Sequence, residues 1–201
     1  FSCSGNDQDE VKGVVTFAED GPLTARVGLS LISVEQARAN LIREVGNRSY
    51  RAVLRLARDR WASQFDKVRI EASEEVKTIF YTALYHSLLY PRKIDEYGRY
   101  YSAFDDAIHN GVMYNCWSMW DTYRAEHPLL TIVAPEHIDD MMQSLVEMFN
   151  EGGWLPKWPN PSYTGIMVGS PAETILAEAW TKGFRGFDVE QAYAAIKKNA
   201  T

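Results

Sequence analysis

The 201-residue chain carries 27 acidic and 21 basic side chains, so its formal net charge at pH 7 is −6. A negative balance argues against a nucleic-acid backbone as partner. Hydrophobic residues make up 46% of the sequence and charged residues 24%, which is typical of a folded globular protein. No apolar run approaches the roughly 20 residues of a membrane span, and no signal peptide is visible.

The chain contains two cysteines, Cys3 and Cys116. Two cysteines this far apart define neither a disulfide framework nor a zinc site. A bridge between them is therefore disfavoured.

The first 32 residues carry strand signals. Val11–Ala18 and Leu23–Ile32 are predicted as two strands with a turn at residues 20–22. Apolar residues alternate with small or polar ones along the second, which is typical of a strand with one buried face. Two strands alone are marginal in water, so the pair needs further strands. Residues 1–10 are polar and expected to be loose.

Helical signals take over after residue 32. We expect a helix opened by the capping box of Ser33 and Gln36, a second from about Ser49 to Phe65, and a third that runs from the cap Ser73 to Pro91. His86 lies on the third helix without a partner at ligand spacing. It is therefore expected to be a hydrogen-bonded core histidine.

The C-terminal half combines a turn-rich stretch with further helices. Arg92–Tyr114 lacks helical periodicity and predicts a short hairpin. Four helices are expected after it, over Ser118–Val133, Pro135–Asn150 and Pro171–Lys182, and from Val189 to the end. The third has Ser170 as its cap, with Glu173 completing a capping box. The last helix ends with its apolar stripe unpaired, which indicates a chain cut short.

Tryptophan and charged residues are concentrated between Tyr114 and Trp158. Four of the six tryptophans lie here, beside Asp121, Arg124 and Lys157. Indole rings cover the C–H face of a sugar, and charged groups hydrogen-bond its hydroxyls. Gly152–Pro161 is rich in glycine, proline and tryptophan, which predicts a rigid loop that carries aromatic rings. The pattern favours a cleft for a polar, flat-faced ligand.

A plainer interpretation remains open for this stretch. Trp120 and Arg124 stand four residues apart, so a core-facing tryptophan beside a surface arginine on an ordinary helix explains them equally well.

The sequence from Trp117 to Trp158, WSMWDTYRAEHPLLTIVAPEHIDDMMQSLVEMFNEGGWLPKW, resembles the signature region of glycoside hydrolase family 92. The similarity extends through FYTALYHSLLYPR, GRYYSAFD and GIMVGSPAETILAEAWTKGFRGFD, so it covers most of the chain. Members of this family are calcium-dependent, inverting exo-α-mannosidases that are several times longer than this chain.

The resemblance implies a mainly α fold: part of an (α/α)6 toroid preceded by a short β-hairpin from a β-sandwich. Residues 1–32 would be the last strands of that sandwich, residues 33–72 linking helices, and residues 73–201 the first part of the helical catalytic domain.

The resemblance also implies site residues. Trp120 and Asp121 match the family's Trp-Asp pair, which contacts the mannose at the cleaved end, and Lys157 and Trp158 match its Pro-Lys-Trp. Arg124, three residues after Asp121, is expected to orient that carboxylate. The family's histidine is missing near Gly169-Ser170-Pro171, which leaves the neighbouring subsite undefined.

Inverting hydrolysis needs two carboxyl groups roughly 6.5–9.5 Å apart. No catalytic pair is assigned, because in the family the acid and the base lie further toward the C-terminus; the candidates are Asp105, Asp106, Asp121, Glu126, Glu151 and Glu173. Calcium is implied by resemblance only, and no ligands are identifiable: His137 with Asp140 is a weak pair.

The sequence thus predicts an inverting exo-α-mannosidase that acts on terminal α-linked mannose, on α-1,2-mannosides or N-glycans, in a bacterial periplasm, at the cell surface or secreted. The 201 residues alone are expected to be inactive and to associate with the remainder of the chain or with themselves. Two alternatives stay open: a non-catalytic carbohydrate-binding module, and another toroid enzyme such as a glucosidase or lyase.

Overall fold

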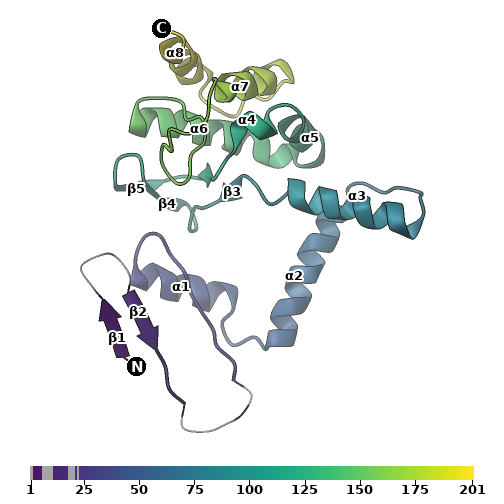
Figure 1. The fold of residues 1–201 in the computed structure, drawn as a ribbon, viewed down its shortest axis with the longest axis vertical. Coiled ribbons are helices and arrows are strands. Elements are labelled where there is room, and N and C mark those ends of the chain that lie inside the picture. Colours follow the sequence, from purple (N-terminus) through teal and green to yellow (C-terminus); the bar gives the residue numbers. More distant parts are fainter. Residues whose placement is uncertain (1, 6–10, 18–20, 22) are drawn as a thin grey trace.

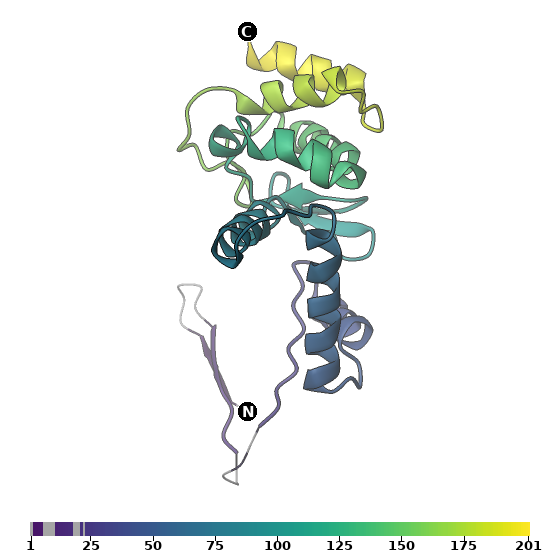
Figure 2. The same ribbon diagram turned by 90° about the vertical axis from the view of Figure 1, so that its right-hand side faces the viewer.

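The computed structural model describes residues 2–5, 11–17, 21 and 23–201. Two antiparallel strands, β1 (Ser2–Gly5) and β2 (Val11–Val14), are followed by three helices, α1 (Val34–Glu44), α2 (Tyr50–Phe65) and α3 (Glu74–Ser87). Both ribbon views place the β1–β2 hairpin at the opposite end of the molecule from the C-terminus (Figures 1 and 2).

Four short strands form two antiparallel pairs after α3. β3 (Arg92–Lys93) pairs with β6 (Tyr114–Asn115), and β4 (Arg99–Ser102) pairs with β5 (Ala107–Asn110). The predicted hairpin in this stretch is therefore confirmed.

The C-terminal part of the chain is helical. Its elements are α4 (Met119–Thr122), α5 (Glu126–Val133), the short 3-10 turn η1 (Pro135–His137), α6 (Ile138–Gly152), α7 (Pro171–Thr181) and α8 (Val189–Asn199). α7 and α8 lie on one side of α6, and the β4–β5 hairpin lies on the other (Figure 1). None of the described helices is long and apolar enough to cross a membrane.

The hydrophobic core belongs to this C-terminal part. Buried residues of α6, such as Met142, Leu145 and Val146, pack with α7, α8 and Trp117, which is fully buried. α2 has no buried residue, and the one buried residue of α1 is Asn40. The core that supports any site therefore begins near Leu84 and extends to α8.

Helix starts agree with the sequence where a serine or aspartate side chain caps the first turn. The hydroxyls of Ser33 and Ser73 accept hydrogen bonds from the backbone N–H groups three residues ahead, and Asp188 does the same at α8. Ser170 occupies the cap position of α7 but makes no side-chain cap hydrogen bond, so the predicted capping box with Glu173 does not form. Pro171 does begin the helix, as expected.

The predicted strand over Leu23–Ile32 is wrong. The segment forms no strand and lies beside α1, where a Cβ on Gly28 would stand 2.3 Å from the carbonyl oxygen of Ala37. A strand needs a neighbouring strand to bond, and the alternating apolar side chains, including Val27 and Leu29, remain exposed. β2 pairs instead with β1, inside the stretch that was expected to be loose.

Two further expectations are corrected. The helix predicted over Ser118–Val133 is interrupted between α4 and α5, because Pro128 has no N–H to bond the carbonyl of Arg124. His86 is exposed rather than part of the core, because the buried side of α3 is narrow and includes only Leu84 as a buried residue.

Candidate functional site

The segment between α6 and α7 is a loop held by its own hydrogen bonds. Gly153 ends α6 with a left-handed φ of 87°. The hydroxyl of Tyr163 accepts from the backbone N–H of Trp154 at 3.0 Å and donates to its carbonyl at 2.6 Å. Farther along, Thr164 Oγ1 donates to the carbonyl of Trp158 at 2.9 Å. These bonds support the prediction of a rigid loop.

Gly152 allows the loop to close onto the β4–β5 hairpin. A Cβ at this position would lie 2.4 Å from the Tyr163 hydroxyl and 2.8 Å from the Phe104 ring. The rings of Phe104 and Tyr163 meet edge to face with centroids 4.7 Å apart. This packing therefore requires a residue without a Cβ, which is glycine, at position 152.

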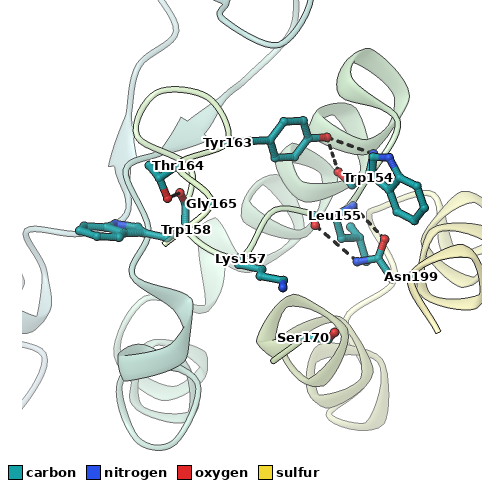
Figure 3. A pocket seen from close by; sticks show the side chains of 9 residues that line it. All are labelled: Trp154, Leu155, Lys157, Trp158, Tyr163, Thr164, Gly165, Ser170 and Asn199. Carbon is teal, nitrogen blue, oxygen red and sulfur yellow. Dashed lines mark hydrogen bonds between the residues drawn. The ribbon is translucent and has the colours of Figure 1, made fainter. Parts of the chain in front are cut away.

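A first hollow, the loop hollow, opens beside this segment and has a volume of about 400 Å³. Its lining residues are Trp154, Leu155, Lys157, Trp158, Tyr163, Thr164, Gly165, Ser170 and Asn199. Figure 3 shows Trp158 and Trp154 at opposite ends of the hollow, with the Lys157 side chain between them. Asn199 holds Leu155 in place, because its side-chain amide accepts a hydrogen bond from the backbone N–H of Leu155 and donates one to its carbonyl. The hollow combines indole faces with the ammonium group of Lys157, for which no ion pair is found among the described residues.

A second hollow, the helix hollow, measures about 270 Å³ and lies beside α4 and α5. Its lining residues are Tyr90, Arg92, Cys116, Ser118, Thr122, Glu126, Trp158 and Asn160. Trp158 lines both hollows, so its half-buried ring separates two concave surfaces. Cys116 is a free thiol, and burial raises the pKa of that thiol.

Of the four predicted contact residues, Lys157 and Trp158 line these hollows, and Trp120 and Asp121 do not. Lys157 and Trp158 meet in the loop hollow. Asp121 is exposed and accepts a hydrogen bond from Ser118, which lines the helix hollow. Trp120 is 39% exposed and lines neither hollow. Convergence of all four on one concave surface therefore stays a prediction.

Arg124 does not take its expected role as the partner of Asp121. Its Nη1 donates to the carbonyl of Trp120 at 2.6 Å, and its guanidinium carbon lies 4.2 Å from the centroid of the Trp120 ring. The break in the helix after α4 leaves that carbonyl available to the side chain. Arg124 thus contacts the tryptophan of the Trp-Asp pair instead of the aspartate.

Two of the six catalytic candidates, Glu126 and Glu173, have a carboxyl oxygen that is buried without a hydrogen-bond partner among the described residues. Burial raises the pKa of Glu126 to about 7. Its Oε1 is buried and has no hydrogen-bond partner among the described residues, and the same holds for Thr122 Oγ1 one helical turn earlier. The sequence alone did not single out Thr122 and Glu126, because two residues spaced four apart also fit a solvated helix face.

A cluster of hydrogen-bonded side chains, which includes two carboxylates, joins the β4–β5 hairpin to the end of α6. Asp105 accepts from His109 at 2.9 Å, and the two oxygens of Glu151 accept from the hydroxyls of Tyr100 and Ser102. Asp105, His109 and Glu151 each offer one atom that could bind a metal ion, and these three atoms lie within 4.8 Å of one another. Calcium prefers about six to eight oxygen ligands, so a set with a histidine nitrogen and an already hydrogen-bonded carboxylate does not fit it.

Comparison with known protein families identifies the family of this chain. Residues 36–201 match the glycosyl hydrolase family 92 catalytic domain. Because the match covers most of the chain, the chain belongs to glycosyl hydrolase family 92.

Solved structures show the same fold. A family 92 inverting mannosidase from Bacteroides thetaiotaomicron matches with a TM-score of 0.79 and 38% identity over 83% of this chain and 23% of that one. A family 92 α-mannosidase from the same organism matches with a TM-score of 0.81 and 30% identity over 86% of this chain and 24% of that one. The second has also been solved in complex with mannoimidazole.

A curated relative is an uncharacterized secreted glycosidase from Arthroderma benhamiae. It is 24% identical over 192 residues, which cover 91% of this chain and 21% of the relative. The chain therefore spans less than a quarter of the length of this relative and of the inverting mannosidase.

Proposed function

We propose that the whole protein containing this chain is an inverting exo-α-mannosidase that releases terminal α-linked mannose from α-1,2-mannosides or N-glycans. The observation that carries this proposal is the family 92 match over residues 36–201. The structural similarity to an inverting mannosidase at 38% identity supports it.

The four matched residues supply the chemistry of sugar contact. The Trp120 and Trp158 rings are partly exposed, and each offers an apolar face to the C–H side of a mannose ring. The Asp121 carboxylate accepts hydrogen bonds from sugar hydroxyls, and the Lys157 ammonium donates them. Arg124 holds the Trp120 ring and is a positioning residue.

We leave the catalytic acid and base and the calcium ligands unassigned in this chain. Inversion requires a carboxyl pair roughly 6.5–9.5 Å apart, and the close cluster of Asp105 and Glu151 is a hydrogen-bonded tie to His109, Tyr100 and Ser102. Calcium dependence is proposed for the whole protein as a property of the family.

The remaining proposals follow from the family. The helices from residue 73 onward would be the first part of an (α/α)6 toroid, residues 33–72 linking helices, and residues 1–32 the end of a β-sandwich. The substrate would be a mannose-containing oligosaccharide or N-glycan met in the periplasm, at the cell surface or outside the cell. One relative is itself named a secreted glycosidase.

The test is to assay the whole protein with an aryl α-mannoside, the matching α-glucoside and a uronate polymer, each with calcium and with a chelator. Calcium-dependent release from the mannoside supports the proposal. Cleavage of the glucoside or the polymer instead would identify another toroid enzyme. Binding of mannose without cleavage of any substrate would identify a carbohydrate-binding module.

A further inference from the structure

Two consecutive residues of the loop after α6 each have both of their backbone groups bonded by a single side chain. The Tyr163 hydroxyl accepts from the N–H of Trp154 at 3.0 Å and donates to its carbonyl at 2.6 Å. Asn199, the last residue of α8, bonds Leu155 in the same way, at 3.3 Å to the N–H and 3.4 Å to the carbonyl. Tyr163 and Asn199 therefore form a double clamp on the backbone of two neighbouring residues (Figure 3).

The double clamp lies directly before the predicted contact pair Lys157 and Trp158. Only Pro156 separates the clamped Leu155 from Lys157, and both Leu155 and Pro156 are buried. Because the proline ring fixes its own φ near about −65°, few backbone rotations remain between the clamp and the Lys157 side chain. Trp158 follows at once, and its carbonyl accepts from Thr164 Oγ1 at 2.9 Å. A shift of the clamped residues would therefore displace Lys157 and Trp158 as well.

The two clamp side chains connect the loop to separate parts of the fold. The ring of Tyr163 packs edge to face on Phe104, which lies between β4 and β5, with centroids 4.7 Å apart. Next to Asn199 on α8, Lys198 places its Nζ 4.6 Å from the centroid of the Trp154 ring. The β4–β5 hairpin and α8 lie on opposite sides of α6 (Figure 1), so the double clamp holds the loop to both.

Water can satisfy the backbone groups of a surface loop, whereas a fixed side-chain bond orders both partners at an entropic cost. Such ordering is useful where side chains must meet a ligand, because a misplacement of about 1 Å can cost roughly 100-fold in rate. We propose that Tyr163 and Asn199 are positioning residues of the enzyme, which hold Lys157 and Trp158 in the orientation that binds the sugar. The inference rests on the proposed mannosidase function, which assigns the sugar contact to these two side chains.

The test removes the clamp bonds while it leaves the surrounding packing in place. Tyr163→Phe keeps the ring that packs on Phe104 and loses only the hydroxyl, and Asn199→Ala loses both amide hydrogen bonds. In each variant of the whole protein we expect kcat/KM for an aryl α-mannoside to fall roughly fivefold to thirtyfold. Circular dichroism checks that each variant folds. If Asn199→Ala does not fold, Tyr163→Phe decides the outcome.

Matched controls lose the same chemical groups outside the loop hollow. The Tyr101 hydroxyl donates to Asp106 at 2.8 Å, and the Asn150 amide donates to Glu147 at 3.2 Å. Neither Tyr101 nor Asn150 lines the hollow. Tyr101→Phe and Asn150→Ala should therefore change kcat/KM by less than about twofold. Losses in these controls as large as those in the clamp variants would overturn the proposal.

A mutant cycle separates positioning from a general structural effect. If the clamp acts through Lys157, the fold loss caused by Tyr163→Phe or Asn199→Ala should shrink to about a third or less when Lys157 is already alanine. A structural role alone predicts the same fold loss in the Lys157→Ala background as in the wild-type background. That result, or unchanged kcat/KM in both clamp variants, would overturn the proposal.

Failure of the mannosidase proposal gives a different result. If the wild-type protein cleaves no α-mannoside, that proposal fails, and mannose binding measured by ligand-observed NMR tests the clamp. A mannose signal that weakens in Tyr163→Phe and Asn199→Ala, but not in Tyr101→Phe and Asn150→Ala, supports positioning of the contact pair. An unchanged signal, or no signal from the wild-type protein, overturns it.

Discussion

The guanidinium of Arg124 lies over the indole ring of Trp120, 4.2 Å from its centroid, and bonds the carbonyl of the same residue. The arrangement recurs at the end of α7, where Arg185 lies 3.4 Å from the centroid of the Trp180 ring and donates to the Trp180 carbonyl at 2.5 Å. In both places an arginine beyond the last helical turn caps a carbonyl and covers a tryptophan. The Trp180 pair therefore offers a matched control for the Trp120 pair.

Arg124→Ala should lower kcat/KM for an α-mannoside roughly threefold to tenfold, because Trp120 loses the cation and the hydrogen bond that position it. Arg124→Lys should recover part of this loss, since lysine keeps the charge but not the planar donor group. The measurement is steady-state kinetics of the whole protein, with Arg185→Ala as control. If the two alanine variants behave alike, Arg124 has no particular role at the site.

Trp120→Ala and Asp121→Ala should each remove most of the activity while leaving the fold intact. A lost charged hydrogen bond or sugar contact costs on the order of 2–4 kcal/mol of transition-state binding, or about 30- to 1000-fold in kcat/KM. Trp180→Ala, which removes a tryptophan of similar exposure, should be nearly neutral. Wild-type kinetics in either site variant, with an unchanged circular dichroism spectrum, would refute the assignment of that residue.

Stability should depend on pH through Glu126. Its pKa is raised to about 7 by burial, so between its ordinary value and 7 the folded state binds more protons than the unfolded state. The stabilising contribution is present below the ordinary carboxyl pKa and is lost as the pH rises through about 7. Thermal unfolding of Glu126→Gln and wild type should therefore differ more at pH 8 than at pH 5, to the advantage of the variant. A difference that is constant with pH would contradict the buried, unpaired state of this carboxyl.

The cluster at Glu151 gives a prediction about stability. Its side chain is 5% exposed and accepts from the hydroxyls of Tyr100 and Ser102. Glu151→Leu leaves both donors buried without their acceptor and should cost about 2–4 kcal/mol in the free energy of unfolding. Chemical denaturation should show this loss, while the exposed Glu71→Leu should change stability by less than about 0.5 kcal/mol. Equal stability of the two variants would mean that the hairpin is not held by this carboxylate.

The sequence predicted the helix starts well where a capping side chain precedes the first turn. Ser33, Ser73 and Asp188 cap helices because a short polar side chain next to a helical stripe has one dominant use. Ser170 has the same pattern without the cap hydrogen bond, because its backbone geometry differs. Capping chemistry is therefore predictable from the pattern, but the backbone angle that permits it is not.

Features that depend on distant neighbours were not predictable. The period of two in Leu23–Ile32 indicated a strand, yet a strand forms only where another strand accepts its hydrogen bonds, and Gly28 instead allows close approach to α1. The family pattern identified Lys157 and Trp158, which do meet in the loop hollow. It did not single out Thr122 and Glu126, because whether a polar atom is buried and unbonded is a property of the packed structure.

The most direct test of the proposed activity is ¹H NMR of the sugar released by the whole protein, with calcium, from an α-linked mannoside. Inversion places the incoming water on the opposite face of the anomeric carbon, so β-mannose should appear first and the α-anomer should follow by mutarotation. Asp121→Ala should release little of either. The appearance of α-mannose first, or the absence of any mannose from the wild-type protein, would contradict the assignment of an inverting exo-α-mannosidase.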